Sequence, residues 1–556
     1  YEALSFDPEF KAIYEAMKEI TKREIQLGPA IGPVITWHGP GPSVLTKDEI
    51  LHKTNEELAQ FLATFEEKDS WQGPTVRGLA EMLKQVMQDN PEKFVDDLKP
   101  FLNAGYLYVY YMFWGLKDAW ANKKEFDWQK LFNFTKEYLE QDEFWRNELP
   151  MADKGGWNPD NETVVGEISE LIQEGTRDDA RAFPDTLFED AEKILWLILD
   201  RLAYPPAPEG EYSDYVTHAL NSSWGKTISA FIIFVLRIVR VNEKNGDKKG
   251  IKWDKNFREK YDTLLDKGIV EAYTWLGNYL PQLKYIDDEW AKQKIVDLDG
   301  NKREKIWAAF MNGYLYGGRV YEDLYELMRP HYEYGINYDF KESHDKQRLV
   351  QHISIGYLRG QEALGGSYSL FRKVLDQWNH EKIRDIISYF WMQRDYATLK
   401  NEDSEKTRQK IIEFWKWVFE RYQNKEAGQL DKNDKLLFSD ISKLAVFLPE
   451  INDDNFQWLL QVAPYVKEDF GSPFFIEYLD GLKEKGKDNT KIAEYIGKIF
   501  LTMLERFTPD YDTSHIRSIV EFLYEAKTTE KAIEICNIYG SRGYEFLRDI
   551  YEKHNK

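Results

Sequence analysis

The sequence has a single cysteine, no long apolar run and a deficit of basic residues. One cysteine, Cys536, among 556 residues excludes an internal disulfide framework and favours a reducing compartment. The longest apolar run, residues 230–236, is cut by Arg237 far short of the roughly 20 residues that span a bilayer. No signal peptide is visible at the N-terminus. The sequence therefore predicts a soluble, cytoplasmic protein.

The charge balance is acidic, with 96 Asp and Glu against 74 Lys and Arg and a net charge of -22. Nucleic acid and anionic membranes are themselves polyanions, so we expect neither as a partner. The sequence has no HExxH motif and no cysteine pair, so we expect no metal and no cofactor. Its 42% hydrophobic and 15% aromatic residues are ample for a folded core.

Apolar residues recur every three or four positions throughout the chain, and almost nothing alternates with period two. This pattern predicts an all-α fold. Short breaks between helices of similar length indicate an α-solenoid of stacked antiparallel helix pairs, similar to HEAT or tetratricopeptide arrays. We predict an N-terminal helical region at 1–204, a central region at 211–425 and C-terminal helical repeats at 426–556. Pro205–Gly210 (PPAPEG) is the expected first linker.

The stretch Thr217–Val241 is the best candidate for a central core helix, because residues 230–236 leave no polar face. It also contains Gly225-Lys226-Thr227, which resembles the end of a P-loop. A P-loop requires glycine five positions before Gly225, where this chain has Leu220. We therefore predict that Ser222 or Ser223 caps a helix and that Gly225 permits close packing.

Several other helix limits follow from caps and apolar spacing. Thr46 and Glu49 predict a capping box for a helix at 47–65, and Ala104–Trp120 predicts a helix buried on all faces. Further helices are expected at 260–276 and 320–328.

Six short motifs occur in a distinctive order. They are GPTVRGL at 73–79, NPEKF at 90–94, DW at 127–128, LNSSWGK at 220–226, YELMRPHY at 325–332 and QHISIGYLRG at 351–360. Over most of the chain this order resembles the helical C-terminal, sensor-like regions of large bacterial STAND and antiphage-defence NTPases. Where relatives commonly have arginine before the glycine of the fourth motif, this chain has Trp224.

The resemblance implies that the chain is the array that recognises a trigger, for example a phage protein. The effector and NTPase modules would precede it, and any oligomer would form through the full-length protein. The first residue is Tyr1 and not methionine, which either a piece of a longer protein or a processed N-terminus would explain.

A carbohydrate-active (α/α)-barrel hydrolase is the alternative, because acidic, aromatic-rich helical chains include such enzymes. Trp71, Trp114, Trp120, Trp128 and Trp157 are the candidates for stacking on sugar rings. Candidate acid and base pairs are Glu143 with Glu148 and Asp185 with Glu189. Carboxylates are so frequent that such pairs arise by chance, so no catalytic residue is assigned.

The tyrosine-rich segment 314–338 is the predicted binding surface, since tyrosine offers large contact area for little lost side-chain freedom. Helix packing alone would produce the same spacing. The predicted contact residues are Tyr321, Tyr325, Arg329, His331, Tyr332 and Tyr334. The leading hypothesis is a non-catalytic module that binds a protein partner, and a passive scaffold is the third possibility.

Overall fold

The computed structural model describes residues 7–21, 41–67, 73–150, 157–204, 214–246, 253–397, 399, 401–486 and 490–555. Helices account for all regular structure within these ranges, which contain no strand. The predicted all-α, solenoid-like fold is confirmed. The chain divides into two compact units, the first comprising residues 1–175 and 182–201 and the second residues 176–181 and 202–556.

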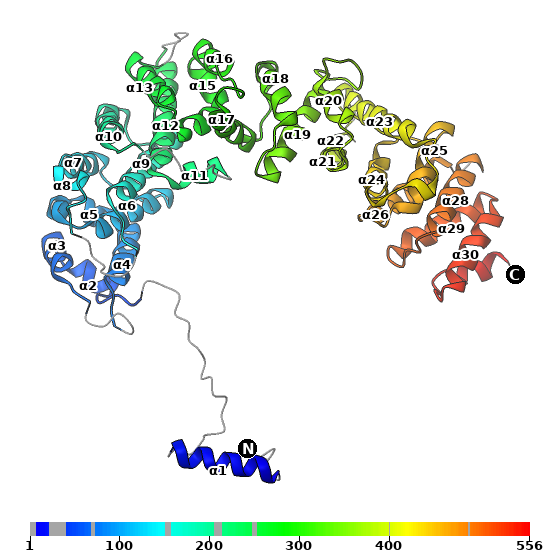
Figure 1. The fold of residues 1–556 in the computed structure, drawn as a ribbon, viewed down its shortest axis with the longest axis horizontal. Coiled ribbons are helices and arrows are strands. Elements are labelled where there is room, and N and C mark those ends of the chain that lie inside the picture. The colour runs from blue at the N-terminus through cyan, green and yellow to red at the C-terminus, as the bar shows by residue number, and fades with distance from the viewer. Residues whose placement is uncertain are drawn as a thin grey trace. The chain divides into compact units, whose positions relative to one another are not determined.

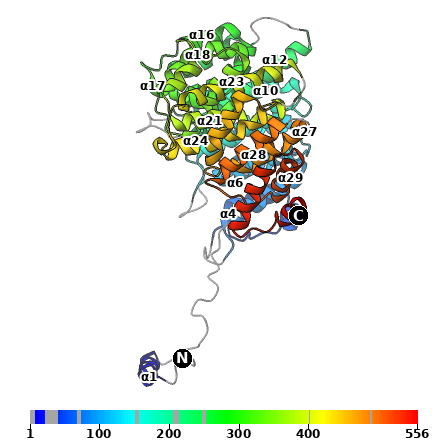
Figure 2. The same cartoon turned by 90° about the vertical axis from the view of Figure 1, so that its right-hand side faces the viewer.

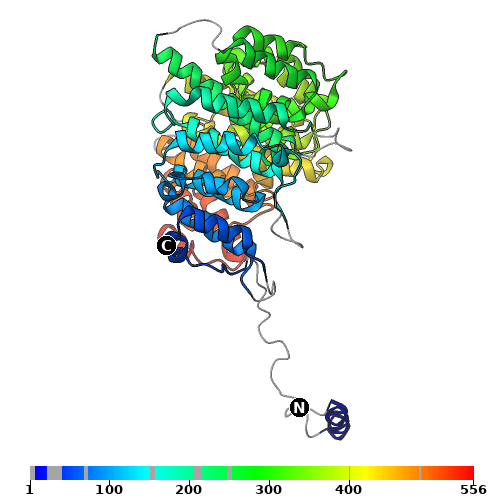
Figure 3. The same cartoon turned by 90° about the vertical axis from the view of Figure 1, so that its left-hand side faces the viewer.

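The first unit is a stack of short and medium helices, which Figure 3 shows as successive blue-to-cyan layers. Its closest helix pair is α4 and α6. The elements are α1 (Pro8–Thr21), α2 (Lys47–His52), α3 (Asn55–Thr64), α4 (Val76–Asp89), α5 (Pro91–Val95), η2 (Lys99–Asn103), α6 (Tyr106–Ala121), α7 (Trp128–Leu139), α8 (Asp142–Trp145), α9 (Asn161–Arg177), η3 (Asp185–Leu187) and α10 (Phe188–Arg201).

Aromatic rings form the core of this unit. Trp128 lies with its ring centroid 5.1 Å from that of Trp120, 5.4 Å from Phe132 and 5.2 Å from Phe183. Helix α6 is buried over most of its circumference, as its sequence predicts. Edge-on ring contacts add to the burial of apolar area, so this cluster joins α6, α7 and the segment before α10.

The second unit is by itself a row of helices in chain order, coloured green to red toward the C-terminus (Figures 1 and 2). Its first half comprises α11 (Tyr215–Asn221), α12 (Ser223–Lys244), α13 (Lys255–Asp266), α14 (Val270–Asn278), α15 (Leu280–Ile286), α16 (Asp288–Val296), α17 (Glu304–Gly317), α18 (Glu322–Asn337), α19 (Ser343–Arg359), α20 (Leu370–Asp376) and α21 (His380–Met392).

Its second half keeps the same local pairing, with α25 against α28 and α29 against α30. The elements are α22 (Arg394–Ala397), α23 (Glu402–Tyr422), η4 (Ala427–Gln429), α24 (Lys432–Ser442), η5 (Lys443–Phe447), α25 (Asp453–Val462), η6 (Ala463–Tyr465), α26 (Ser472–Gly481), α27 (Lys483–Gly486), α28 (Thr490–Leu504), α29 (Thr513–Glu525), α30 (Thr529–Ser541) and α31 (Arg548–His554).

The expected core helix at 217–241 is two helices, because the chain turns at Ser222 between α11 and α12. The Ser222 hydroxyl accepts from the Gly225 N–H at 3.0 Å, so the predicted cap is confirmed. A methyl group on Gly225 would overlap the carbonyl oxygen of Ala219, so the predicted close approach is also confirmed. Trp224 is buried, and its indole N–H donates to the Ala203 carbonyl at 2.8 Å.

Three predicted helix limits are wrong. The helix expected at 47–65 is divided because Thr54 forms a second capping box behind that of Thr46. The helix expected at 260–276 is interrupted by Gly268, which has a positive φ of 72°. Helix α18 does not end at 328 but continues through Pro330 to Asn337.

Among the helices that the structure describes, none combines the length and the apolar character that crossing a bilayer requires. The predicted linker Pro205–Gly210 lies outside the described residues.

Candidate functional site

The tyrosine segment is held by a buried carboxylate, Glu362, whose side chain is fully buried. Its Oε1 accepts from the Tyr325 hydroxyl at 3.0 Å and pairs with Arg329. Its Oε2 accepts from the N–H of Leu370 at 2.6 Å. Arg329 also donates to the carbonyl of Tyr368, whose side chain is 87% exposed. Tyr325 and Arg329 therefore anchor the loop at 360–369 that displays Tyr368.

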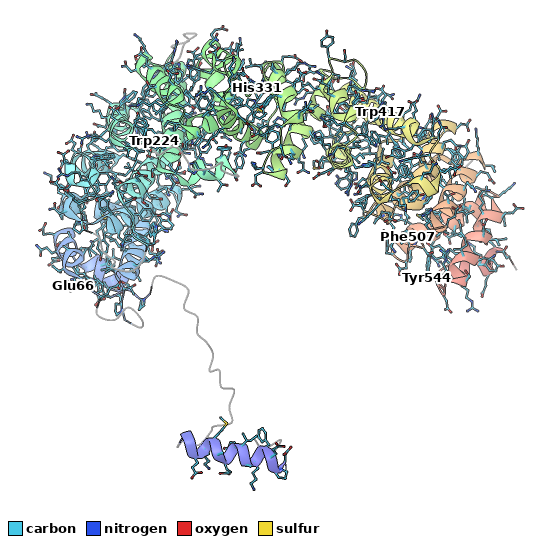
Figure 4. The ribbon with its side chains drawn as sticks, viewed as in Figure 1. Glu66, Trp224, His331, Trp417, Phe507 and Tyr544 are labelled. Atoms are coloured by element: carbon cyan, nitrogen blue, oxygen red, sulfur yellow. The ribbon has the colours of Figure 1, made fainter. Side chains whose placement is uncertain are left out.

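His331 is buried within the same segment, and Figure 4 marks it among the packed helices. The indole N–H of Trp307 donates to His331 Nδ1 at 3.1 Å, and Nε2 lies 3.2 Å from the carbonyl of Ile295. These partners require a neutral ring with its proton on Nε2. Burial lowers the pKa of His331 to about 4, in agreement with a neutral packing role.

Tyr332 lies in a second buried network. Its hydroxyl is 2.9 Å from that of Tyr314 and 3.2 Å from Nδ1 of His352. Burial lowers the pKa of His352 to about 3. The side chain of Tyr332 is 0% exposed, so it packs helices together and offers no surface to a partner.

The remaining two predicted contact residues reach the surface. Tyr321 occupies the position before the first residue of α18, without a capping hydrogen bond from its side chain, and is 41% exposed. Tyr334 is half-buried against Trp307, with ring centroids 4.6 Å apart. It lines a pocket of about 340 Å³ with Glu304, Asn337, Tyr338, Asp339 and Lys341.

Thus the six predicted residues do not share one face. Tyr325, His331 and Tyr332 are buried. A contact role for Tyr321, Arg329 and Tyr334 stays a prediction.

The residues considered for sugar chemistry have ordinary structural partners. Trp120 and Trp128 are buried in the core and present no face to a ligand. Glu143 and Glu148 are exposed and both pair with Arg146. Trp114 stacks under Lys84, and Glu189 pairs with Lys193. Trp157 is 48% exposed, and Asp185 is exposed as well. Trp71 lies outside the described residues.

A mixed cluster of His380, Asp431 and Asp434 brings three possible ligand atoms within 4.8 Å of one another. The carboxylate of Asp434 already accepts from Tyr422 at 2.5 Å and from Lys425 at 2.8 Å. Burial works to raise the pKa of Asp434, but the hydrogen bonds from Lys425, Tyr422 and His380 outweigh it and lower the pKa to about 2. A metal ion would have to displace the Lys425 ammonium, so the cluster fits a structural role.

The second unit also carries a groove that the sequence did not indicate. It has a volume of about 380 Å³ and lies among α21, α24, η5 and α26. We call it the Phe470 groove. Its apolar residues are Ile387, Trp391, Phe470 and Phe474, and its polar residues are Glu381, Arg384, Asp385, Ser388, Asp440, Lys443 and Asp469.

Phe470 is the unusual residue of the groove, because its aromatic side chain is 82% exposed. Its φ of 54° lies in the left-handed region, which costs a non-glycine residue roughly 1–2 kcal/mol. Two contacts fix the backbone before Phe470: the Asp469 N–H donates to the Ser439 hydroxyl at 2.8 Å, and the Asp469 carboxylate pairs with Arg384. After it, a side chain at Gly471 would overlap the Ser439 carbonyl. The loop is therefore packed firmly while its aromatic side chain faces water.

Three further apolar side chains are exposed on elements that line the groove or contact those that do. Met392 is 50% exposed, Tyr396 42% and Val446 42%. Their elements α21, α22 and η5 contact one another. Sequence reasoning missed this surface because an apolar residue in a helical pattern is normally assigned to the core.

Comparison with protein-family models, with curated proteins and with solved structures finds no match for the chain. The case for function therefore stands on the geometry described above and on the order of the motifs.

Proposed function

We propose that the chain is a non-catalytic helical recognition module that binds a protein partner through the Phe470 groove. The observation that carries this proposal is the rigid display of Phe470. An apolar ring that is 82% exposed on a left-handed backbone costs free energy twice, in hydration and in conformation. Strain of this kind is typical of binding and switch sites, where a partner covers the residue.

The neighbouring side chains support a protein ligand over a small molecule. Trp391 and Phe474 pack edge to face with centroids 5.0 Å apart, and Met392 and Val446, on the groove-lining elements α21 and η5, are exposed. Aromatic side chains and methionine are enriched where protein interfaces are best buried. Covering one phenylalanine is worth about 1.5–3 kcal/mol, enough to make Phe470 a principal contact.

In the full-length protein, binding at this surface would be relayed to an NTPase module that precedes the chain. The motif order, from GPTVRGL at 73–79 to QHISIGYLRG at 351–360, supports this link through its resemblance to sensor regions of STAND and antiphage-defence proteins. A phage protein is the kind of trigger that the resemblance suggests. The gene sequence upstream of Tyr1 tests the link directly, since a gene without an NTPase module would contradict it.

Site-specific photo-crosslinking tests the binding proposal. A photoreactive phenylalanine analogue replaces Phe470 in the chain expressed in its native host. The matched control carries the analogue at Tyr285, which is 42% exposed on the same unit but does not line the groove. We expect a discrete protein adduct from position 470 and none from position 285. Equal or absent adducts at the two positions would refute the proposal.

A further inference from the structure

The charges of the Phe470 groove do not balance locally. Arg384 pairs with Asp440 at 2.5 Å and also with Asp469, and Lys443 pairs with Asp440 at 2.7 Å. Arg384 is thus engaged by both Asp440 and Asp469, and Lys443 by Asp440 alone. Asp385 is left over, because within the described residues its carboxylate accepts only from the Gln347 amide, at 3.1 Å.

Asp385 is half-buried, and burial raises the pKa of its carboxyl group. Glu381, one turn earlier on α21, lines the same groove and adds a second negative charge. A cation placed here would be attracted to Asp385 more strongly than to a carboxylate at the open surface, because Asp385 is already partly desolvated. The net charge of -22 would also speed the approach of a basic partner.

The aromatic wall lies a short distance along the same helix. Asp385 and Trp391 are six residues apart on α21, which corresponds to about 9 Å along the helix axis. The guanidinium carbon of Arg394 lies 3.9 Å from the Trp391 ring centroid, so this ring already attracts a cation from its own chain. Phe470 and Phe474 complete the apolar side.

We propose that the Phe470 groove binds a segment of a protein partner in which a lysine or arginine lies two to four positions from a large apolar residue. The basic side chain pairs with Asp385, and the apolar side chain covers Phe470 and Trp391. The axial separation of about 9 Å corresponds to about three residues of extended chain, at about 3.3 Å each, and the reach of the side chains widens the range to two to four. This inference rests on the proposed function and specifies the chemistry of its partner.

Selection from a phage-displayed library of random dodecapeptides tests the inference, with the full chain as the target. Peptides are kept if Phe470→Ala removes their binding. We expect these peptides to combine Lys or Arg with Phe, Leu, Ile or Trp at the stated spacing. Asp385→Asn should weaken them about tenfold, the equivalent of about 1.4 kcal/mol. Asp376→Asn, an exposed aspartate outside the groove, is the matched control and should leave the affinity unchanged.

A second change keeps the test independent of how well the protein variant folds. Replacing the basic residue of a selected peptide by norleucine should cost the same factor of about ten against the unaltered chain, and nothing further against Asp385→Asn. Phe470-dependent peptides that lack a basic residue, or that bind Asp385→Asn equally well, would overturn the inference and leave the proposed function standing. A selection that yields no Phe470-dependent peptide would overturn both.

Discussion

Lowering the pH from 7.5 to 5 should loosen helices α18 and α19, because His331 and His352 are buried there as neutral rings. Burial lowers their pKa values to about 4 and about 3, against roughly 6.5 in the unfolded chain. The unfolded chain therefore binds more protons as the pH falls below 6.5. The stability is fully present above pH 6.5 and declines as the pH falls toward the folded-state values.

The magnitude follows from proton linkage. At pH 5, protonation of each imidazole stabilises the unfolded state by about 2 kcal/mol, whereas the same imidazole in the folded state stays mostly neutral. The two histidines together should therefore lower the free energy of opening by about 4 kcal/mol between pH 7.5 and pH 5. Carboxylates with ordinary pKa values are still mostly ionised over this range. Burial raises the pKa of Asp345 on α19, so this one carboxyl group opposes the two histidines and makes about 4 kcal/mol an upper value.

Hydrogen exchange of the α18 and α19 amides, corrected for the intrinsic pH dependence of exchange, measures this opening. His352→Phe keeps the ring and removes one titrating group, so it should halve the pH dependence. Leu349→Ala is the control: it removes buried apolar contacts in the same helix and should lower stability equally at both pH values. A change of less than about 1 kcal/mol in the unaltered chain, or an unchanged slope in His352→Phe, would refute the reasoning.

Three further predictions concern single positions. Gly225→Ala should destabilise the second unit by about 1–3 kcal/mol and lower the melting temperature, whereas Gly428→Ala, with open space around it, should not; equal melting temperatures would contradict the close packing at Ala219. Glu362→Gln should lower the free energy of opening of the 360–369 loop by about 2 kcal/mol, which hydrogen exchange at Leu370 would report as faster exchange. Unaltered exchange would contradict the anchoring role. Phe470→Gly should raise thermal stability slightly, by about 0.5 kcal/mol after the added flexibility of glycine is subtracted, while abolishing the binding of selected peptides; a lower melting temperature would show that the ring packs internally.

The sequence predicts the fold class well because helical periodicity is a local property. Helix ends depend on single residues, which explains two of the three errors. Thr54 and Gly268 stop helices that apolar spacing alone would continue. Pro330 fails to stop α18, because tertiary packing holds the turns on both sides of it.

The candidate site was less accessible from the sequence. Whether a tyrosine is a contact or a core residue depends on partners far along the chain. Tyr325 is held by a hydrogen bond to Glu362, 37 residues later, and no local sequence pattern predicts this hydrogen bond. The Phe470 groove draws on segments from α21 to α26, more than 80 residues apart, since Arg384 and Asp469 are separated by 85 positions. Such a surface becomes visible only once the helices are stacked.

At position 470 the conformation that lowers the stability of the chain is also the one that exposes Phe470 to a partner. The contacts of Asp469 with Ser439 and Arg384 stabilise a loop conformation in which Phe470 has a strained backbone and a solvent-exposed side chain. The same ion pairs engage Arg384, so among the described residues Asp385 forms no salt bridge and accepts only from the Gln347 amide. One set of contacts therefore creates both halves of the proposed binding surface, the exposed ring and the unpaired carboxylate. Removing Arg384 should disturb the apolar and the electrostatic contributions together, whereas changes at Phe470 and Asp385 separate them.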